Sequence, residues 1–326
     1  MADAHPREVR THEVSQGRLP ARPGKIPRPG WRNILLRVKQ EQSDDNLAII
    51  AAGVAFYWLL AVFPAMAGLI AIYGLVTEPQ QVQEQIQTVS RLLPQQAQAV
   101  IANQATRIAE QSADTLQLAA VLGFLGALWS SAKGVKALMQ SLNIAYGEEE
   151  ERGFFKLNGL ALLLTLGALI LGVVALGLVV ALSPLLGNIG LGFAARTIVN
   201  ILRWPVLAAL AIFALGVVYR YAPDRERSEW RWVNVGAVTA TVLWLAASGL
   251  FSWYVSNFGN YNETYGSVGA IIILLMWFLI TAYVILLGAE LNSEIERQTS
   301  TDTTDGRRQP MGRRGAYAAD TVGEAP

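Results

Sequence analysis

The sequence contains no cysteine and only two histidines, His5 and His12, both near the N-terminus. Without cysteine there are no disulfides, thiolate metal sites or cysteine nucleophiles. Metal-dependent hydrolysis needs several His, Cys or carboxylate ligands that converge on one site. No phosphate-cradling loop, Gly-x-Ser-x-Gly elbow or dinucleotide fingerprint is present either. We therefore expect no cofactor and no enzymatic activity.

Charge is also scarce, because only 16% of the 326 residues are charged whereas 52% are hydrophobic. Such a chain is too apolar for an ordinary soluble domain, so its expected solvent is lipid. The net charge of +1 gives no reason to expect nucleic acid or an acidic protein as a partner. The expected partners are membrane lipids, and the oligomeric state is left open.

Long stretches free of Asp, Glu, Lys and Arg indicate six transmembrane helices, since about 20 apolar residues cross about 30 Å of hydrocarbon. They span residues 47–76, 115–132, 157–182, 198–219, 232–255 and 268–289. Pro64 lies inside the first span and is its expected kink. The sequence thus predicts an all-α, polytopic membrane domain over residues 31–297. The polar tails, 1–30 and 298–326, are expected to be disordered.

The distribution of positive charge predicts the orientation, because Lys and Arg are retained on the cytoplasmic side of a membrane. Of the 26 Lys and Arg residues, 22 lie before the first span (1–46), after the last span (290–326) and in the segments 130–156 and 220–231. The three opposite segments hold only Arg91, Arg107 and Arg196. Both termini are therefore expected in the cytoplasm, which agrees with an even number of spans.

Amphipathic patterns occur on both sides of the predicted bundle. The outer segment 78–115 has apolar residues three and four apart, which predicts a helical hairpin. This hairpin either caps the bundle by packing or forms a lid over a cavity. On the cytoplasmic side, residues 133–146 and 31–39 predict interfacial helices that anchor the chain or contact anionic lipid headgroups.

Two polar features border or enter the lipid. Arg203 lies inside the fourth span, where it either extends to the outer headgroups or faces a polar cavity and binds an anionic group. The segment that joins the last two spans is either a plain outer loop or a re-entrant segment. If it lines the same cavity as Arg203, the expected substrate-binding residues also include Asn257, Asn260, Tyr261, Asn262 and Tyr265.

Several stretches resemble one family of bacterial membrane proteins. They are Ala51–Trp58 with Phe63-Pro64, Trp129–Leu138 with Asn143–Tyr146, Tyr219–Pro223, Tyr254–Ser267, and Leu287–Asn292. Together they resemble the YihY/BrkB family, also known by the older label ribonuclease BN, over residues 31–297. The resemblance implies a six-helix protein of the bacterial inner membrane that is linked with the cell envelope and has no settled activity.

These observations lead to an expected function and to an expected ion pair. The function is transport or flipping of an amphipathic or lipid-linked envelope molecule. The alternative is a non-catalytic scaffold or assembly factor, and a ribonuclease comes last. Glu290, at the cytoplasmic end of the last span, is expected to pair with Lys133 or Lys136, or else to remain a hydrated, unpaired carboxylate.

Overall fold

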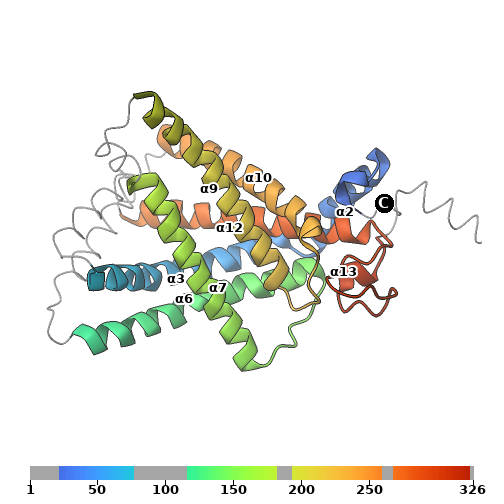
Figure 1. Ribbon diagram of the computed structural model, residues 1–326, viewed down its shortest axis with the longest axis horizontal. Helices are drawn as coiled ribbons and strands as arrows, with labels where there is room; N and C mark the ends of the chain where they lie inside the picture. The colour runs from blue at the N-terminus through green and yellow to red at the C-terminus, as the bar shows by residue number, and fades with distance from the viewer. Residues whose placement is uncertain (1–21, 77–115, 182–192, 259–266, 324–326) are drawn as a thin grey trace, which may run out of the picture.

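The computed structural model is an all-helical bundle, described over residues 22–76, 116–181, 193–258 and 267–323 (Figure 1). Its long helices are α3 (Leu47–Val76), α6 (Leu116–Tyr146), α7 (Phe154–Leu176), α9 (Phe193–Tyr221), α10 (Trp230–Phe258) and α12 (Ser267–Arg297). Its short elements are η1 (Pro23–Lys25), α2 (Arg28–Asp44), the π-helical turn η3 (Gly177–Ala181) and α13 (Tyr317–Asp320).

Five helices of the described residues are long and apolar enough to cross a membrane, so the chain is a polytopic membrane protein. The five stretches are Leu47–Met66, Phe154–Val179, Ile201–Tyr221, Trp230–Asn257 and Val268–Arg297. The first helix begins and ends where the charge-free run predicted, with Pro64 inside it. Helix α12 continues for two more turns beyond the predicted end of the last span, to Arg297.

The predicted second span and the predicted interfacial helix at 133–146 form one helix, α6. Nε1–H of Trp58 on α3 donates to the carbonyl oxygen of Gly134 at 3.2 Å. Met139 and Leu142, which were expected to face the bilayer surface, are fully buried. The interfacial prediction for 133–146 is therefore wrong. Gly134 has no side chain to hold α3 away, so the apolar face of α6 enters the core instead.

Helices α10 and α12 cross closely where Gly236 faces Gly288. A Cβ atom on Gly236 would overlap the carbonyl oxygen of Gly288 and would lie 2.6 Å from Cγ of Asn292. A Cβ atom on Gly288 would lie 2.8 Å from Cβ of Ala240. The small residues Gly236 and Ala240, four apart on α10, thus allow the two backbones to approach.

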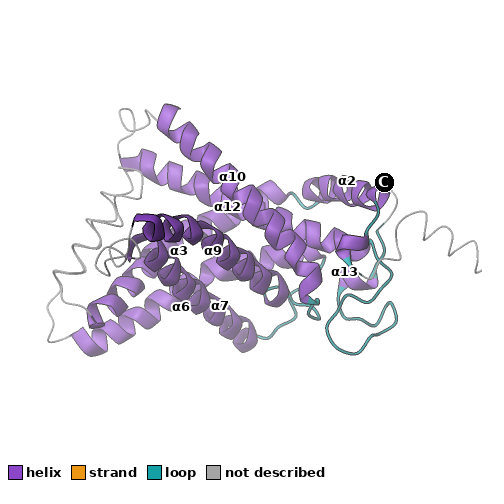
Figure 2. Ribbon diagram, turned by 45° about the horizontal axis from the view of Figure 1, so that its top comes forward, coloured by secondary structure: helices purple, strands orange, loops and turns teal. Residues whose placement is uncertain are grey.

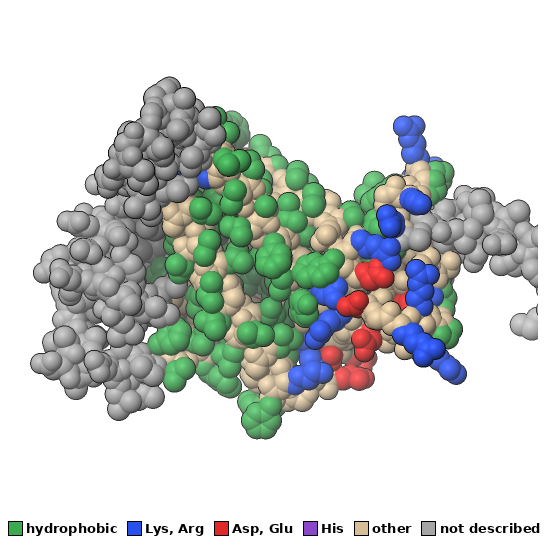
Figure 3. Space-filling view, viewed as in Figure 1, with side chains coloured by type: hydrophobic (Ala, Val, Ile, Leu, Met, Phe, Trp, Pro, Cys, Tyr) green, Lys and Arg blue, Asp and Glu red, His purple; other side chains and the backbone are tan. Residues whose placement is uncertain are grey.

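The charged residues gather at one end of the bundle (Figure 3). This end, called the charged end below, holds α2, the start of α3, the turn 147–153, the loop 222–229 and the end of α12. Long-range contacts join these segments: Arg37 on α2 forms an ion pair with Glu294 on α12, and the backbone N–H of Asp224 donates to Oδ1 of Asn143 at 2.8 Å. The flanks of the helices carry mainly hydrophobic side chains on the visible face.

Residues 298–323 pack against the charged end, whereas the sequence indicated disorder (Figure 2). Arg314 is buried, and its guanidinium donates to the carbonyl oxygens of Ala319 at 2.6 Å and Ser300 at 2.9 Å. The Asp320 carboxylate accepts backbone N–H groups at the start of the same turn. The polar groups of this segment therefore form hydrogen bonds within the segment. The amino-acid composition, from which disorder was expected, does not reveal such bonds.

Residues 22–30, which were also expected to be disordered, form η1 and the first turn of α2. Ile26 and Ile34 are buried against the charged end. On the opposite face of α2, Leu35 is 59% exposed, and it lies next to exposed basic residues of the same helix. The interfacial prediction for 31–39 is therefore wrong for Ile34 and Val38, which pack in the protein core, and for Arg37, which is buried in its ion pair with Glu294.

Candidate functional site

Most residues of the expected substrate-binding segment lie outside the described residues. These are Asn260, Tyr261, Asn262 and Tyr265, in 259–266, and the expected outer hairpin in 77–115 also lies outside them. Asn257 belongs to the last turn of α10, is exposed, and donates from Nδ2 to the carbonyl oxygen of Trp253 at 2.8 Å. A re-entrant or a surface course of 259–266 stays a prediction.

Arg203 lies within the apolar stretch of α9 and is half-buried. Its Nη1 donates to the carbonyl oxygen of Val179 at 3.4 Å. Val179 lies in η3, where α7 widens into a π-helical turn, a feature that is frequent at functional sites. The guanidinium also lies over the ring of Trp204, 5.4 Å from its centroid. Arg203 therefore joins α9 to the irregular end of α7.

A second group of polar residues, buried at the charged end, was missed as a site by sequence reasoning. Asn292 on α12 is fully buried; its Oδ1 accepts the backbone N–H of Gly236 at 2.7 Å and its Nδ2 donates to Oη of Tyr146 at 3.4 Å. Oη–H of Tyr219 on α9 donates to the carbonyl oxygen of Ile285 at 2.7 Å. Asn292, Tyr146 and Tyr219 come from three of the stretches that carried the family resemblance, and they meet here.

A buried ion pair closes this end of the bundle. Nη2 of Arg225 lies 2.6 Å from Oε2 of Glu296, and the two side chains are 2% and 0% exposed. Hydroxyl groups of Ser228 and Thr303 each donate to the Glu296 carboxylate at 2.8 Å. The Arg225 guanidinium stacks over Tyr146, 4.8 Å from the ring centroid. Because Glu296 has additional hydrogen bonds, its burial is compensated.

Glu290 is buried, with 2% of its surface exposed, and the expected ion pair does not form. Among the described residues, neither Lys133 nor Lys136 contacts it; Nζ of Lys136 donates instead to Oδ1 of Asn158 at 2.8 Å. Lys136 therefore faces α7 and Lys133 is exposed, so α6 presents no cation to α12. The prediction of the pair is wrong, and the alternative of a hydrated carboxylate does not fit the burial.

The carboxyl group of Asp45 faces Glu290 instead. Asp45 is the residue that ends α2, and its side chain shares a hydrogen bond with Glu290. Burial raises the pKa of Asp45 above its usual range, and the neighbouring carboxylate of Glu41 acts in the same direction. A hydrogen bond between two carboxyl groups requires a proton on one of them. Sequence reasoning missed Asp45, although a carboxylate two residues before an apolar span was a visible signal.

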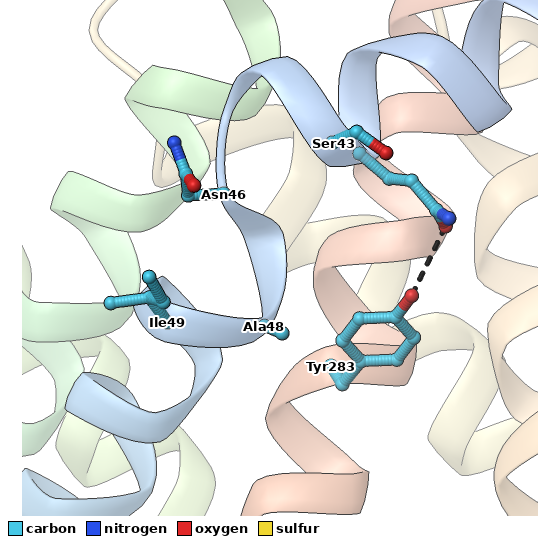
Figure 4. Close-up of a pocket in the computed structure, with 6 residues that line it drawn as sticks. Ser43, Asn46, Ala48, Ile49 and Tyr283 are labelled. Atoms are coloured by element: carbon cyan, nitrogen blue, oxygen red, sulfur yellow. Dashed lines mark hydrogen bonds between the residues drawn. The ribbon is translucent and has the colours of Figure 1, made fainter.

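A small pocket lies where α2 meets α3, beside Tyr283 of α12 (Figure 4). Its volume is about 280 Å³, which is below the range of about 300–1,000 Å³ typical of sites for small molecules. Tyr283 of α12 forms one wall, and its hydroxyl donates to Oε1 of Gln42 at 3.0 Å. The lining residues are Gln42, Ser43, Asn46, Ala48, Ile49 and Tyr283. The pocket suits water or an ion better than a lipid.

Comparisons with known proteins identify the family. The profile of the virulence factor BrkB family matches residues 38–312. The ribonuclease-like protein YfkH of Bacillus subtilis (strain 168) is 30% identical over 258 residues, covering 76% of this chain and 90% of YfkH. A UPF0761 membrane protein of Aliivibrio fischeri (strain ES114) is 25% identical over 274 residues, covering 82% of this chain and 84% of the relative.

A third relative, the UPF0761 membrane protein Bxeno_A3061 of Paraburkholderia xenovorans (strain LB400), is longer. It is 22% identical over 262 residues, covering 78% of this chain and 58% of the relative. No solved structure matches the chain. The match to the family profile includes α3 to α12 and the buried polar residues of the charged end. The chain belongs to the virulence factor BrkB family of polytopic membrane proteins.

Proposed function

We propose that the protein moves an amphipathic or lipid-linked molecule of the bacterial cell envelope through or alongside its helix bundle. The observation that carries this proposal is Arg203, a half-buried cation within an apolar stretch. Ionisable residues within membrane helices are rare because burying their charge in lipid is costly, and such a residue is a functional-site hypothesis by default. Its guanidinium fork matches the geometry of phosphate and carboxylate groups.

The proposal includes α6 as a sixth span. Arg37, before the first span, contacts Glu294 at the end of the last helix. Both residues must then lie on one side of a bilayer whose core is about 30 Å thick, which requires an even number of crossings. Five apolar helices alone would give an odd number. The 31 residues of α6 would extend about 46 Å, which is long enough to cross.

The proposed orientation puts the charged end, and with it both termini, in the cytoplasm. Support comes from the concentration of 22 of 26 Lys and Arg residues in segments on that side. Arg203 is 18 residues from the end of α9 at Tyr221, or about 27 Å along the helix, which corresponds to the outer half of the bundle. The substrate would therefore present its anionic group to the outer half, while its apolar chain contacts the exposed helix faces.

Solvent access at position 203 tests the proposal. The native chain has no cysteine, so single cysteines can be introduced without background. Arg203→Cys should react with membrane-impermeant thiol reagents added from outside the cell. Leu202→Cys is the matched control, because Leu202 lies at the same depth and is 57% exposed on the flank of the helix, where lipid would cover it. Faster labelling at 203 than at 202 is expected from a hydrated cavity.

Slow labelling at both positions would contradict the cavity and favour a scaffold. That second function has its own support at the charged end, where residues 298–323 and the Arg225–Glu296 pair close the bundle. Equally fast labelling at 202 and 203 would also contradict a cavity, because the start of the apolar stretch would then simply lie in water.

The printed name of the Bacillus relative raises RNA cleavage as a competing activity for this chain. We propose that the protein is not a nuclease. Within the described ranges, no group of three or more His, Cys, Asp or Glu residues is arranged to hold a metal ion. Metal-dependent RNA cleavage that persists through purification and is lost on a single substitution within a span would refute this proposal.

A further inference from the structure

The carboxyl groups of Asp45 and Glu290 form a buried pair between two elements far apart in sequence. Glu290 is 2% exposed and shares a hydrogen bond with Asp45. Its other oxygen, Oε1, is buried without a hydrogen-bond partner in the described structure. An ionised carboxylate with an unpartnered oxygen is costly to bury, because it has lost water and gained no donor. The protonated acid avoids most of this cost.

The cations nearest to the pair are committed to other carboxylates. Arg37 contacts the carboxylate of Glu294, and its Nη2 donates to Oε1 of Gln298 at 2.9 Å. Nη1 of Arg297 lies 2.8 Å from Oε1 of Glu41 and also contacts Glu294. The cluster thus has four carboxyl groups and two guanidinium groups, so full ionisation would leave an excess of negative charge. One proton on Asp45 or Glu290 reduces that excess.

In the part of the chain that the structure describes, the other helices packed against α12 supply no cation to the pair. Helix α3 contains no charged residue. The only charged residue of α10, Arg231, contacts Glu229, and α6 presents the phenol of Tyr146. The remaining acidic group nearby is Asp44 on α2. The acidic neighbours Glu41 and Glu294 therefore favour protonation of the pair, while the two guanidinium groups are shared with those same carboxylates.

We propose that Asp45 and Glu290 form a proton-binding site that holds one shared proton at neutral pH. The proton resides on one carboxyl group and is donated to the oxygen of the other, so that the pair carries a single negative charge. Asp45 is only half-buried, so the proton can exchange with solvent at the charged end. The raised pKa of Asp45 agrees with this arrangement. The site stands independently of the proposed transport.

Infrared spectroscopy of the purified, full-length protein tests the site, because protonated carboxylic acids and carboxylates absorb separately. We expect a protonated-acid band at pH 7 that disappears on alkaline titration. Glu290→Gln should remove the band, whereas Glu149→Gln should keep it, because Glu149 is exposed. Asp45→Asn should move the midpoint of the titration to lower pH, since one interacting negative charge is removed.

Absence of the band in the wild type at pH 7, or its full retention in Glu290→Gln, would overturn the proposal. If Glu290→Gln does not fold, the alkaline titration of the wild type and the midpoint in Asp45→Asn decide the question in the same way. Loss of the band on addition of Na⁺ at constant pH would also overturn it, because the pair would then be a cation site. None of these results depends on whether the protein moves a lipid.

Discussion

Replacement of Gly236 by alanine tests the packing of α10 against α12 at the centre of the charged end. The new Cβ atom would overlap the carbonyl oxygen of Gly288 and would lie 2.6 Å from Cγ of Asn292. The first neighbour is backbone, and the amide of Asn292 is fully buried and held by hydrogen bonds to Gly236 and Val233, so the two helices must separate. Overpacking of this kind costs about 1–3 kcal/mol or more.

Separation of the helices would also weaken a hydrogen bond. The backbone N–H of Gly236 donates to Oδ1 of Asn292 at 2.7 Å, and a bond of this kind contributes about 0.5–1.5 kcal/mol. The two terms together predict a loss of about 2–4 kcal/mol. The matched control is Gly159→Ala on α7, where a Cβ atom meets nothing within 4 Å. That change should be neutral or stabilising by up to about 1 kcal/mol, because alanine favours a helix over glycine.

The assay is thermal unfolding of both variants and the wild type, purified in the same detergent. Gly236→Ala should unfold several degrees below the wild type, and Gly159→Ala at or above it. Equal unfolding temperatures for Gly236→Ala and Gly159→Ala would refute the close helix crossing, and with it the placement of Asn292 against α10.

Three further predictions concern other parts of the molecule. Arg225→Ala should destabilise the protein by about 3–5 kcal/mol in thermal unfolding, because it leaves Glu296 buried without its cation. If high salt alone restored the unfolding temperature of this variant, the pair would be exposed to solvent and not buried. Because the pKa of Asp45 is raised in the folded state, the contribution of this group to stability is fully present below its usual pKa and is lost as pH rises through the folded-state pKa. Asp45→Asn should remove this part of the slope of unfolding temperature against pH, and an unchanged slope would contradict the raised pKa. Reporter fusions after Gln104 should behave as external and those after Glu149 as cytoplasmic, and reversal at either site would refute the six-span topology.

The membrane helices could be predicted from the sequence because lipid imposes a simple requirement: a long run without charge. That requirement located α3 to the residue and identified α7, α9, α10 and α12. It did not reveal that α6 continues past Lys133 and Lys136 into the core, because these charges suggested that the apolar helix had ended. It also failed at the end of α12, where Glu290 and its acidic neighbours are buried against other segments instead of facing water.

The candidate site was harder to predict, because its residues are brought together by tertiary structure. Arg203 was visible as a charge inside an apolar run, and the structure adds its contact with η3. The expected partners of Glu290 were chosen by nearness to the same interface, but the helix faces decide the contacts, and Asp45 is the partner. Tyr146, Tyr219 and Asn292 each belonged to a recognisable stretch, yet nothing in the sequence placed them side by side.

The central claim, that the protein moves an amphipathic molecule with the help of Arg203, is tested most directly in liposomes. The purified protein would be reconstituted with fluorescent phospholipids and lipid-linked analogues, and a membrane-impermeant quencher would be added outside. The account predicts that the fraction of label protected from quenching falls below that in protein-free vesicles, and that Arg203→Ala restores the protection. Protection equal to that in protein-free vesicles for every lipid tested, with protein of verified fold, would contradict it.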